Sequence, residues 1–192
     1  MPDRRVRTLS RDKIVEAALD LIDQNGAGAV TMRGLAQALD VTPMALYNHF
    51  GNKNELLRGV AEHVIDRAEF DGGQAKWQDR LRHCFYTLRR ICLKHPGLPA
   101  MLEIEGAAPA SVFRPMDVAM AALQAAGLDE VESAQAYFVL VGFTLSQATY
   151  QARGPIPGLH ASRQLAADWD YDAGFEYGLE LIITGVSGMA ER

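Results

Sequence analysis

The 192-residue sequence has few cysteines and no long uninterrupted apolar run. Its two cysteines, Cys84 and Cys92, fall in one expected helix about 12 Å apart along the axis, too far for a disulfide between them. No apolar stretch reaches the roughly 18 residues that a membrane-spanning helix needs. The first residues, MPDRRVRTLSRDK, are charged and do not resemble a secretory signal. We therefore expect an intracellular, cytoplasmic protein.

Motifs of metal binding and catalysis are missing as well. The histidines and cysteines form neither CxxC nor HExxH, so we expect no metal site and no cofactor. GxSxG, P-loop and GxGxxG motifs are absent, and neither cysteine has an evident activating partner. Asp168, Asp170 and Asp172 cluster, but helix capping and solvated charge explain them. We therefore expect that the protein is not an enzyme. An enzyme is the main alternative, and turnover of a substrate without DNA binding would favour it.

Charge is distributed unevenly along this chain of net charge -5. Residues 1–13 contain five basic and two acidic residues, whereas residues 1–63 contain eight of each. The later residues therefore supply the whole net charge. An acidic body with a locally basic end is compatible with a nucleic-acid-binding head, although a basic end is also common as a solvated, frayed terminus.

Helix signals dominate the sequence. A first helix is expected to begin after Ser10 and to end at Gly26, because apolar residues between them recur with a period of 3.6. Further starts are expected at Thr31, at Thr42 and Pro43, and at Asn52. Four starts in about fifty residues predict a compact helical head. Longer helices are expected over about 75–94, 112–126, 129–153 and 171–190, with a broken region at 95–110.

Two of the expected helices, over about 31–39 and 43–50, have the dimensions of a helix-turn-helix. Three residues, Asp40–Thr42, form the turn, and the second helix is short enough for the major groove of DNA, about 12 Å wide. Leu35, Leu39, Leu46 and Phe50 can pack inward on Ile14 and Leu21. The opposite face is left for a partner or for water, and it carries Thr42, Pro43, Met44, Ala45, Asn48 and His49.

The stretch KIVEAALDLIDQNGAGAVTMRGLAQALDVTPMALYNHFGNKNELL resembles the DNA-binding domain of the tetracycline-repressor (TetR) family of transcriptional regulators. The resemblance covers about residues 11–60, and its most specific pieces are TMRGLA, LYNHF and NKNELL in that order and spacing. Asp40 replaces the usual glycine of the turn, where Asp tolerates left-handed backbone better than most residues. Asn48 also departs from the family pattern, so an operator sequence does not carry over.

The resemblance implies DNA-binding roles for ten residues. Thr31 is expected to donate to a phosphate, and Arg33 to contact guanine or phosphate in the groove. Tyr47, His49 and Lys53 are expected to bind the DNA backbone. The residues expected to face base edges are Thr42, Pro43, Met44, Ala45 and Asn48, where Asn48 suits adenine and Met44 and Ala45 suit thymine methyls. The plainer alternatives are a solvated Arg33 and a half-buried, packing Tyr47.

The remaining chain matches the family more loosely, through its helical character and the ending FEYGLELIITGV. The resemblance implies an all-α protein with an N-terminal three-helix helix-turn-helix domain, 1–53, and a larger helical effector-binding and dimerisation domain, 54–192. Glycine costs up to about 1 kcal/mol in a helix, so close approach of another helix would compensate for it at Gly174, Gly178, Gly185 and Gly188. The facing residues are expected to be Tyr137, Val141, Leu145 and Ala148.

A homodimer built on the two last helices would place two recognition helices about 34–36 Å apart, which predicts a palindromic double-stranded operator. Candidate residues for a small-molecule effector pocket are Phe85, Leu88, Met101, Met116, Met120, Phe138, Phe143, Gln147 and Tyr150. Each alone is expected in an ordinary core more than in a pocket lining, but as a set they favour a mainly apolar effector. Binding would shift a two-state equilibrium in the spacing of the DNA-binding heads.

The expected function is therefore sequence-specific transcriptional regulation. Repression is expected over activation only because most members of the resembled family are repressors. A helical scaffold that binds a protein in place of DNA is a further alternative. Such a scaffold would tolerate the loss of Arg33 and Lys53. The residues determine neither the effector, the operator, the target genes nor the sign of regulation.

Overall fold

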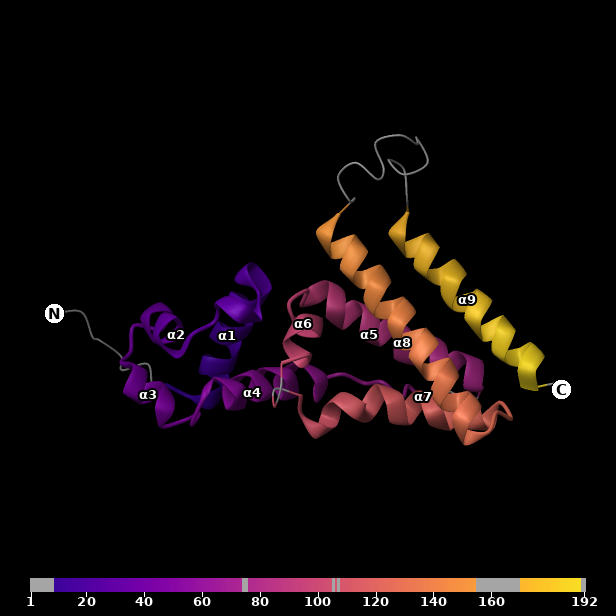
Figure 1. Cartoon of the computed structure of the whole chain (residues 1–192), viewed down its shortest axis with the longest axis horizontal. Coiled ribbons are helices and arrows are strands. Elements are labelled where there is room, and N and C mark those ends of the chain that lie inside the picture. Colours follow the sequence, from indigo (N-terminus) through magenta and orange to yellow (C-terminus); the bar gives the residue numbers. More distant parts are fainter. Residues whose placement is uncertain (1–8, 74–75, 105, 107, 155–169, 191–192) are drawn as a thin grey trace. The chain divides into compact units, whose positions relative to one another are not determined.

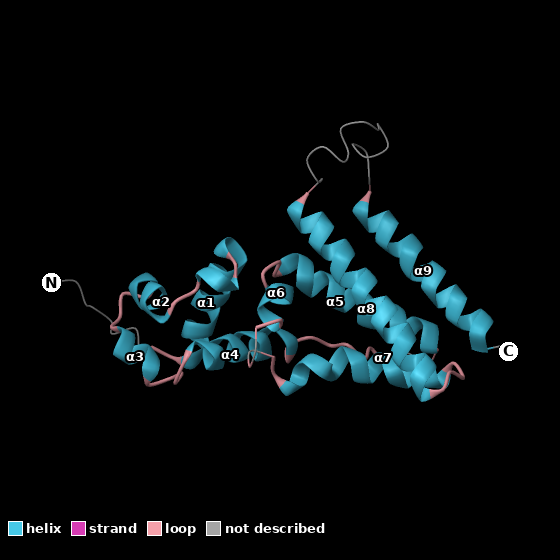
Figure 2. Cartoon of the chain, in the orientation of Figure 1, coloured by secondary structure: helices cyan, strands magenta, loops and turns pink. Residues whose placement is uncertain are grey.

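The regular structure in the described residues of this computed structural model is helical throughout, as the sequence predicts (Figures 1 and 2). The structure describes residues 9–73, 76–104, 106, 108–154 and 170–190. The elements are α1 (Arg11–Asn25), η1 (Ala27–Ala29), α2 (Met32–Ala38), α3 (Pro43–Tyr47), α4 (Lys53–Ile65), α5 (Trp77–Lys94), α6 (Leu98–Leu102), η2 (Ala110–Phe113), α7 (Arg114–Ala125), α8 (Glu130–Arg153) and α9 (Tyr171–Ala190).

Side-chain caps fix the first four helix starts. At Ser10, Thr31, Thr42 and Asn52 the side-chain oxygen accepts a hydrogen bond from the backbone N–H three residues later. Each cap satisfies a donor that the first turn of a helix leaves unpaired. Gly26 ends α1 with a φ of 78°, a backbone conformation that favours glycine. The four expected starts and this expected end are confirmed.

The first compact unit comprises residues 1–65 and 97–110. In it α1 packs on α2 and α4, and α2 packs on α3. The unit extends beyond the expected boundary after residue 53, because α4 buries Leu56, Leu57 and Val60 in this core. It also includes α6, since Gly97 lies directly against Ile22 of α1, where a Cβ would approach the Ile22 Cγ2 atom to 2.6 Å.

The second compact unit comprises residues 66–96 and 111–192. Helices α5, α7 and α8 pack on one another, and α9 packs on α8 and α5. Phe175 of α9 is fully buried and stacks on Phe143 of α8 with ring centroids 5.5 Å apart. At Gly178 an added Cβ would lie 2.3 Å from the Phe143 ring, so the close helix approach expected of this glycine is confirmed inside the unit.

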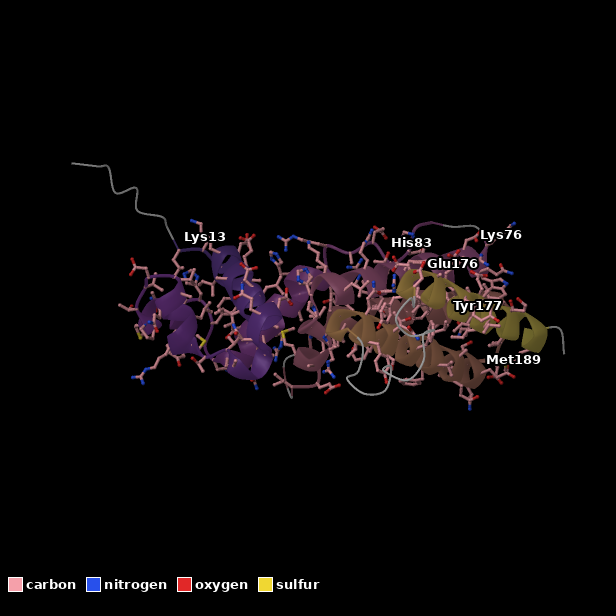
Figure 3. All side chains as sticks on the ribbon, turned by 90° about the horizontal axis from the view of Figure 1, so that it is seen from above. Lys13, Lys76, His83, Glu176, Tyr177 and Met189 are labelled. Atoms are coloured by element: carbon pink, nitrogen blue, oxygen red, sulfur yellow. The ribbon has the colours of Figure 1, made fainter. Side chains whose placement is uncertain are left out.

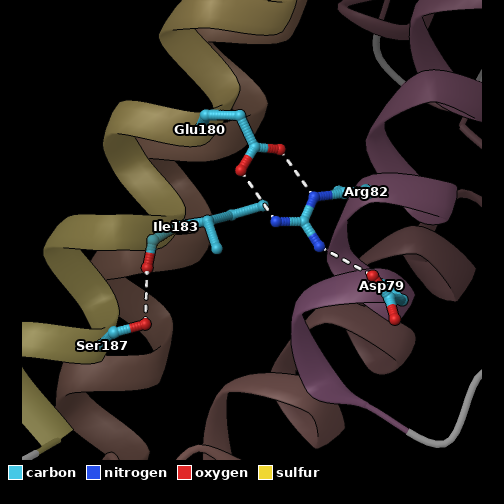
Figure 4. A network of polar contacts seen from close by, with 5 residues as sticks. All are labelled: Asp79, Arg82, Glu180, Ile183 and Ser187. Atoms are coloured by element: carbon cyan, nitrogen blue, oxygen red, sulfur yellow. Dashed lines mark hydrogen bonds and ion pairs between the residues drawn. The ribbon is translucent and has the colours of Figure 1, made fainter.

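Two arginines of α5 bind carboxylates of α9. Arg82 donates through Nε and Nη2 to both oxygens of Glu180, at 2.6 and 2.7 Å, and through Nη1 to Asp79 at 2.7 Å (Figure 4). Two turns further along α5, the buried Arg89 binds Asp172. The planar Arg82 guanidinium matches the Glu180 carboxylate in a bidentate manner, whereas Arg89 donates to Asp172 through Nη2 alone. These contacts fix α9 on the unit at two points.

Several expected boundaries shift in the structure. The helix expected over 43–50 ends at Tyr47, and the helix expected over 75–94 begins at Trp77. The region 95–110, expected to be broken, contains the short helix α6. Among the described helices, none combines the length and apolar character needed to span a membrane.

Hydrogen bonds from Arg82 lower the pKa of Glu180. Because the folded-state pKa is depressed, this stabilisation is present above the ordinary carboxyl pKa of about 4.3 and is lost as the pH falls through the folded-state value. The variant Glu180→Gln is expected to be less stable than the parent at neutral pH, by under about 1 kcal/mol because the pair is partly exposed. Urea unfolding at several pH values should show the difference shrink on acidification. An equal change in the charge-matched variant Glu176→Gln of the same helix would contradict this role.

Burial raises the pKa of the Cys84 and Cys92 thiols to about 12. The thiolate is the reactive form, so both groups are expected to resist alkylation in the folded protein at mildly alkaline pH. Alkylation by iodoacetamide is therefore expected to be much slower in the native protein than in urea, where both thiols are exposed. Mass spectrometry of the quenched reaction measures both rates. Rapid modification of either thiol under native conditions would contradict the buried placement.

Candidate nucleic-acid interface

Helices α2 and α3 pack on each other across a tight turn. Asp40 has a φ of 54°, the left-handed conformation expected of this position. The N–H of Asp40 donates to the Gln37 carbonyl at 3.2 Å, and the N–H of Val41 donates to the Ala36 carbonyl at 3.0 Å. These bonds close α2 and turn the chain into α3. The arrangement is that of a helix-turn-helix.

Residues 43–50, here called the α3 segment, have one buried face and one exposed face. Leu46 and Phe50 are fully buried in the core of the first unit. Met44 is 68% exposed and Tyr47 46% exposed. The remaining residues expected to face DNA are also at the surface: Thr42, Pro43 and Asn48 are exposed, and Ala45 and His49 are half-buried. The structure thus brings these expected contacts together on one short segment.

The other expected DNA contacts flank α3. Thr31 and Arg33 are exposed at the start of α2, where the Thr31 Oγ1 accepts the Gly34 N–H at 3.0 Å. The Thr31 hydroxyl hydrogen can still be donated to a phosphate. Lys53 is half-buried, and its Nζ donates to the Gly28 carbonyl at 3.3 Å. An ammonium carries three donors, so this bond leaves capacity for a phosphate.

Arg11, the first residue of α1, contacts the end of the α3 segment. Its Nη1 donates to the His49 carbonyl at 2.8 Å, and its guanidinium carbon lies 4.0 Å from the centroid of the Phe50 ring. The same Nη1 lies 3.5 Å from the Glu55 Oε1. Sequence reasoning treats Arg11 only as part of a basic terminus, because its partner His49 is 38 residues away. The sequence does contain one hint of this contact: a basic residue, Arg11, in the first turn of one expected helix and an acidic residue, Glu55, in the first turn of another.

An open cleft of about 590 Å³ lies at the start of α4. Its lining is polar and of mixed charge, and consists of Asn52, Lys53, Asn54, Glu55, Arg58 and Gly106. Arg58 bridges the cleft by donating from Nε and Nη2 to the Gly106 carbonyl, at 3.2 and 2.9 Å. This polar lining differs from the mainly apolar effector pocket that the sequence predicts, and it shares no residue with it.

The residues expected to line an effector pocket have diverse environments. Phe85 is fully buried in the second unit, whereas Met101 of α6 is buried in the first. Phe138 and Tyr150 are 65% and 49% exposed. Half-buried positions of the second unit hold the other five, Leu88, Met116, Met120, Phe143 and Gln147. Eight of the nine residues therefore belong to the second unit, although Phe138 and Tyr150 are exposed there, and Met101 belongs to the first.

Helix α8 buries one side in its unit and exposes large apolar side chains on another. Tyr137 and Ala148, two of the four α8 residues expected to face the glycines of the final helix, are buried in the core of the second unit. The side chain that meets Gly178 is that of Phe143, which is not among those four. Successive helical positions differ by about 100°, which carries the neighbouring Phe138 to the outside. The exposed apolar residues of the outer α8–α9 face are Val131, Phe138, Val139, Tyr150, Tyr177, Leu181 and Met189, of which Tyr177 and Met189 are seen on α9 in Figure 3.

The acidic cluster considered for catalysis is occupied by structural contacts where it is described. Asp170 accepts the backbone N–H groups of Asp172 and Ala173 and so caps α9. Asp172 binds Arg89, whose hydrogen bond lowers the pKa of this carboxyl. Asp168 lies outside the described residues. In the described ranges, no group of three or more His, Cys, Asp or Glu side chains is placed to hold a metal ion.

Comparison with known proteins finds relatives along the whole chain. An HTH-type transcriptional regulator of Saccharopolyspora erythraea is 31% identical over 136 residues, which cover 68% of this chain. The match spans 57% of that regulator's length. The structure of ActR of Streptomyces coelicolor in complex with actinorhodin has a TM-score of 0.74 at 28% identity, over 96% of this chain and 99% of the other. That of BioQ with its double-stranded DNA operator has a TM-score of 0.69 at 28% identity, over 94% and 99%.

Two family models match in succession along the sequence. Residues 14–60, which contain the helix-turn-helix, match the model of bacterial regulatory proteins of the tetR family. Residues 71–168 match the C-terminal domain of tetracycline-repressor-like proteins, and so account for about half of the chain by themselves. The order of the two models is the order of the two compact units. The chain belongs to the tetR family of bacterial regulatory proteins.

Proposed function

We propose that this protein is a sequence-specific DNA-binding transcriptional regulator of the repressor type, which a small, mainly apolar effector releases from a palindromic operator. The observation that carries the proposal is the display of the α3 segment, with Met44 and Tyr47 largely exposed over a fully buried inner face. The similar BioQ structure contains operator DNA, and the similar ActR structure contains actinorhodin. Relatives are named as regulators, so we propose no catalytic activity. Access to DNA implies a cytoplasmic location.

The proposed DNA contacts follow from the exposure of each side chain. The α3 segment enters the major groove, where the Asn48 amide suits adenine and Met44 suits a thymine methyl. Arg33 reaches guanine or phosphate from α2. Contacts to the DNA backbone fix the register of the protein without reading bases, and they are assigned to Thr31, Tyr47, His49 and Lys53. The base-facing set is completed by Thr42, Pro43 and Ala45.

We propose a homodimer in which the outer α8–α9 face meets its copy in a four-helix seam. Large exposed apolar side chains on adjoining helices are typical of an interface. At Gly142, Gly185 and Gly188 an added Cβ would meet no described atom within 4 Å, so these positions leave room for a partner helix. Two-fold symmetry would set the two α3 segments about 34–36 Å apart, which calls for a palindromic site.

The effector site is proposed among the half-buried residues of the second unit. Four of these residues are apolar and one is an amide: Leu88, Met116, Met120, Phe143 and Gln147. Phe85 of the same unit is fully buried. Such a lining suits an apolar ligand with a single polar group to orient it. Release from DNA requires that the effector bind one state of the protein more tightly than the other, and the ratio of affinities sets the size of the response.

Loss of Arg33 is expected to weaken specific binding by about 1–3 kcal/mol, because a base contact is removed. The variant Lys53→Ala is expected to weaken binding to all duplexes and to reduce the dependence of affinity on salt, because a phosphate contact is removed. The probe is a duplex recovered by selection from a random pool, and fluorescence titration at several salt concentrations provides the affinities.

The variant Arg90→Ala, which removes an exposed arginine of α5 in the second unit, is the control for Arg33→Ala. Its specific affinity is expected to match that of the parent. Tight operator binding by the triple variant Arg33→Ala, Tyr47→Ala, Lys53→Ala would rule out this mode of docking. A selection that recovers no enriched sequence would rule out sequence-specific binding.

A charge in the proposed seam is expected to separate the dimer. Leu181 is exposed in the single chain, and an aspartate in its place would be desolvated without a partner on association. Sedimentation should therefore show Leu181→Asp as a folded monomer at micromolar concentration, while the parent is a dimer. Ala121→Asp on the exposed surface of α7 carries the same charge and is expected to stay dimeric. A monomeric parent would refute the seam.

A further inference from the structure

We propose that Arg11 is a positioning residue for DNA recognition: it holds the end of the α3 segment from behind and so sets the orientation in which that segment meets the groove. The inference rests on the proposed function and adds to it a residue outside the helix-turn-helix. Arg11 belongs to α1, and all of its contacts described below lie within the first compact unit.

The α3 helix cannot fix its own orientation. It spans only Pro43–Tyr47, whereas isolated helices shorter than about 12 residues are marginal in water. After it, the N–H groups of His49 and Phe50 both return to the Leu46 carbonyl, each at 2.9 Å. These local bonds define the turn but do not tie it to another helix. The bond from Arg11 to the His49 carbonyl provides such a tie.

The guanidinium of Arg11 also covers the aromatic anchor of the segment. Phe50 is fully buried, and Arg11 lies over its ring at a distance of 4.0 Å from the centroid. Gly59 of α4 confines the same ring, because a Cβ there would approach the Phe50 Cε1 atom to 2.9 Å. With the ring confined in this way, a change at Arg11 is transmitted to the backbone that carries Tyr47 and Asn48.

Glu55 completes the arrangement from the α4 side. Its Oε2 accepts the Gly51 N–H at 2.8 Å, while its Oε1 lies 3.5 Å from Arg11. Asn52 accepts the Glu55 N–H at 2.9 Å and so begins the helix that presents this carboxylate. Arg11 and Glu55 together hold the link between α3 and α4, one through the carbonyl of His49 and the other through the amide of Gly51.

The partly exposed position of this pair indicates a geometric role. The side chains of Arg11 and Glu55 are 51% and 41% exposed, and ion pairs of such exposure contribute little to folding stability. A binding site, however, requires its contacts to be held within about 0.5 Å. Lysine cannot replace Arg11, because a point charge on a flexible stem does not combine a directed bond to a carbonyl with stacking on a ring.

The experiment compares two duplexes, one recovered by selection from a random pool and one of random sequence and equal length, with the full-length protein at several salt concentrations. Arg11→Gln and Arg11→Lys are expected to lose about tenfold in affinity for the selected duplex and little for the random one, with an unchanged salt dependence. Glu55→Gln is expected to weaken selected-duplex binding although it removes a negative charge. The double variant Arg11→Gln, Glu55→Gln is expected to bind the selected duplex no more weakly than either single variant, because both residues hold the same link between α3 and α4.

A direct phosphate contact by Arg11 predicts the opposite pattern. Arg11→Gln would then weaken both duplexes alike and lower the salt slope by about one, Arg11→Lys would recover affinity, and Glu55→Gln would bind more tightly. Any of these outcomes would overturn the inference. Arg90→Gln in the second unit is the charge-matched control, and circular dichroism at the assay temperature verifies that each variant is folded.

The inference and the proposed function fail in different ways. If the parent protein binds the selected duplex specifically while the Arg11 variants bind it equally well, the inference alone is overturned. If the selection yields no duplex that the parent prefers, the proposed function is overturned and the inference with it. Should Arg11→Gln prove unfolded, Arg11→Lys provides the test because it retains the charge. Weak binding of the selected duplex by Arg11→Lys would support the inference, and binding equal to that of the parent would overturn it.

Discussion

The proposed DNA-binding surface of this protein depends on the burial of Leu46 and Phe50 in the first unit. The helix between Pro43 and Tyr47 is too short to be stable alone, so its conformation is imposed by the apolar contacts behind it. Burying those two side chains on one face forces the neighbouring Met44 and Tyr47 outward. The proposed DNA-binding surface is thus a consequence of the core of α1, α2 and α4, and it can be no more rigid than that core.

In the second unit, α9 is attached to the other helices although its exposed surface is largely apolar. Phe175 anchors the helix in the core, and Gly178 lets it approach the Phe143 ring. Arg82 and Arg89 of α5 bind its carboxylates. These directional contacts fix α9 without covering its outer face, which leaves that face available to a second copy of the chain.

Arginine has a comparable use in both units. Arg11 in the first unit and Arg89 in the second each lie over a buried phenylalanine. Arg11 also binds the His49 carbonyl in the turn after α3, and Arg89 binds the Asp172 carboxylate of α9. A planar guanidinium can stack and donate at once, so one side chain orients two elements. In a chain of net charge -5, the placement of its cations therefore bears on both proposed surfaces. Averaged charge conceals this arrangement.

The sequence by itself determined the local features, because caps and turns involve residues that are close in the chain. Ser10, Thr31 and Thr42 start helices as predicted, and Asp40 adopts the left-handed turn. Tertiary structure alone decided which side of α8 is buried, since apolar residues surround that helix and periodicity could not separate Tyr137 from Phe138. It also placed Met101 in the first unit and joined Arg11 to His49, because contacts between residues distant in the chain depend on how helices pack and leave no local signal.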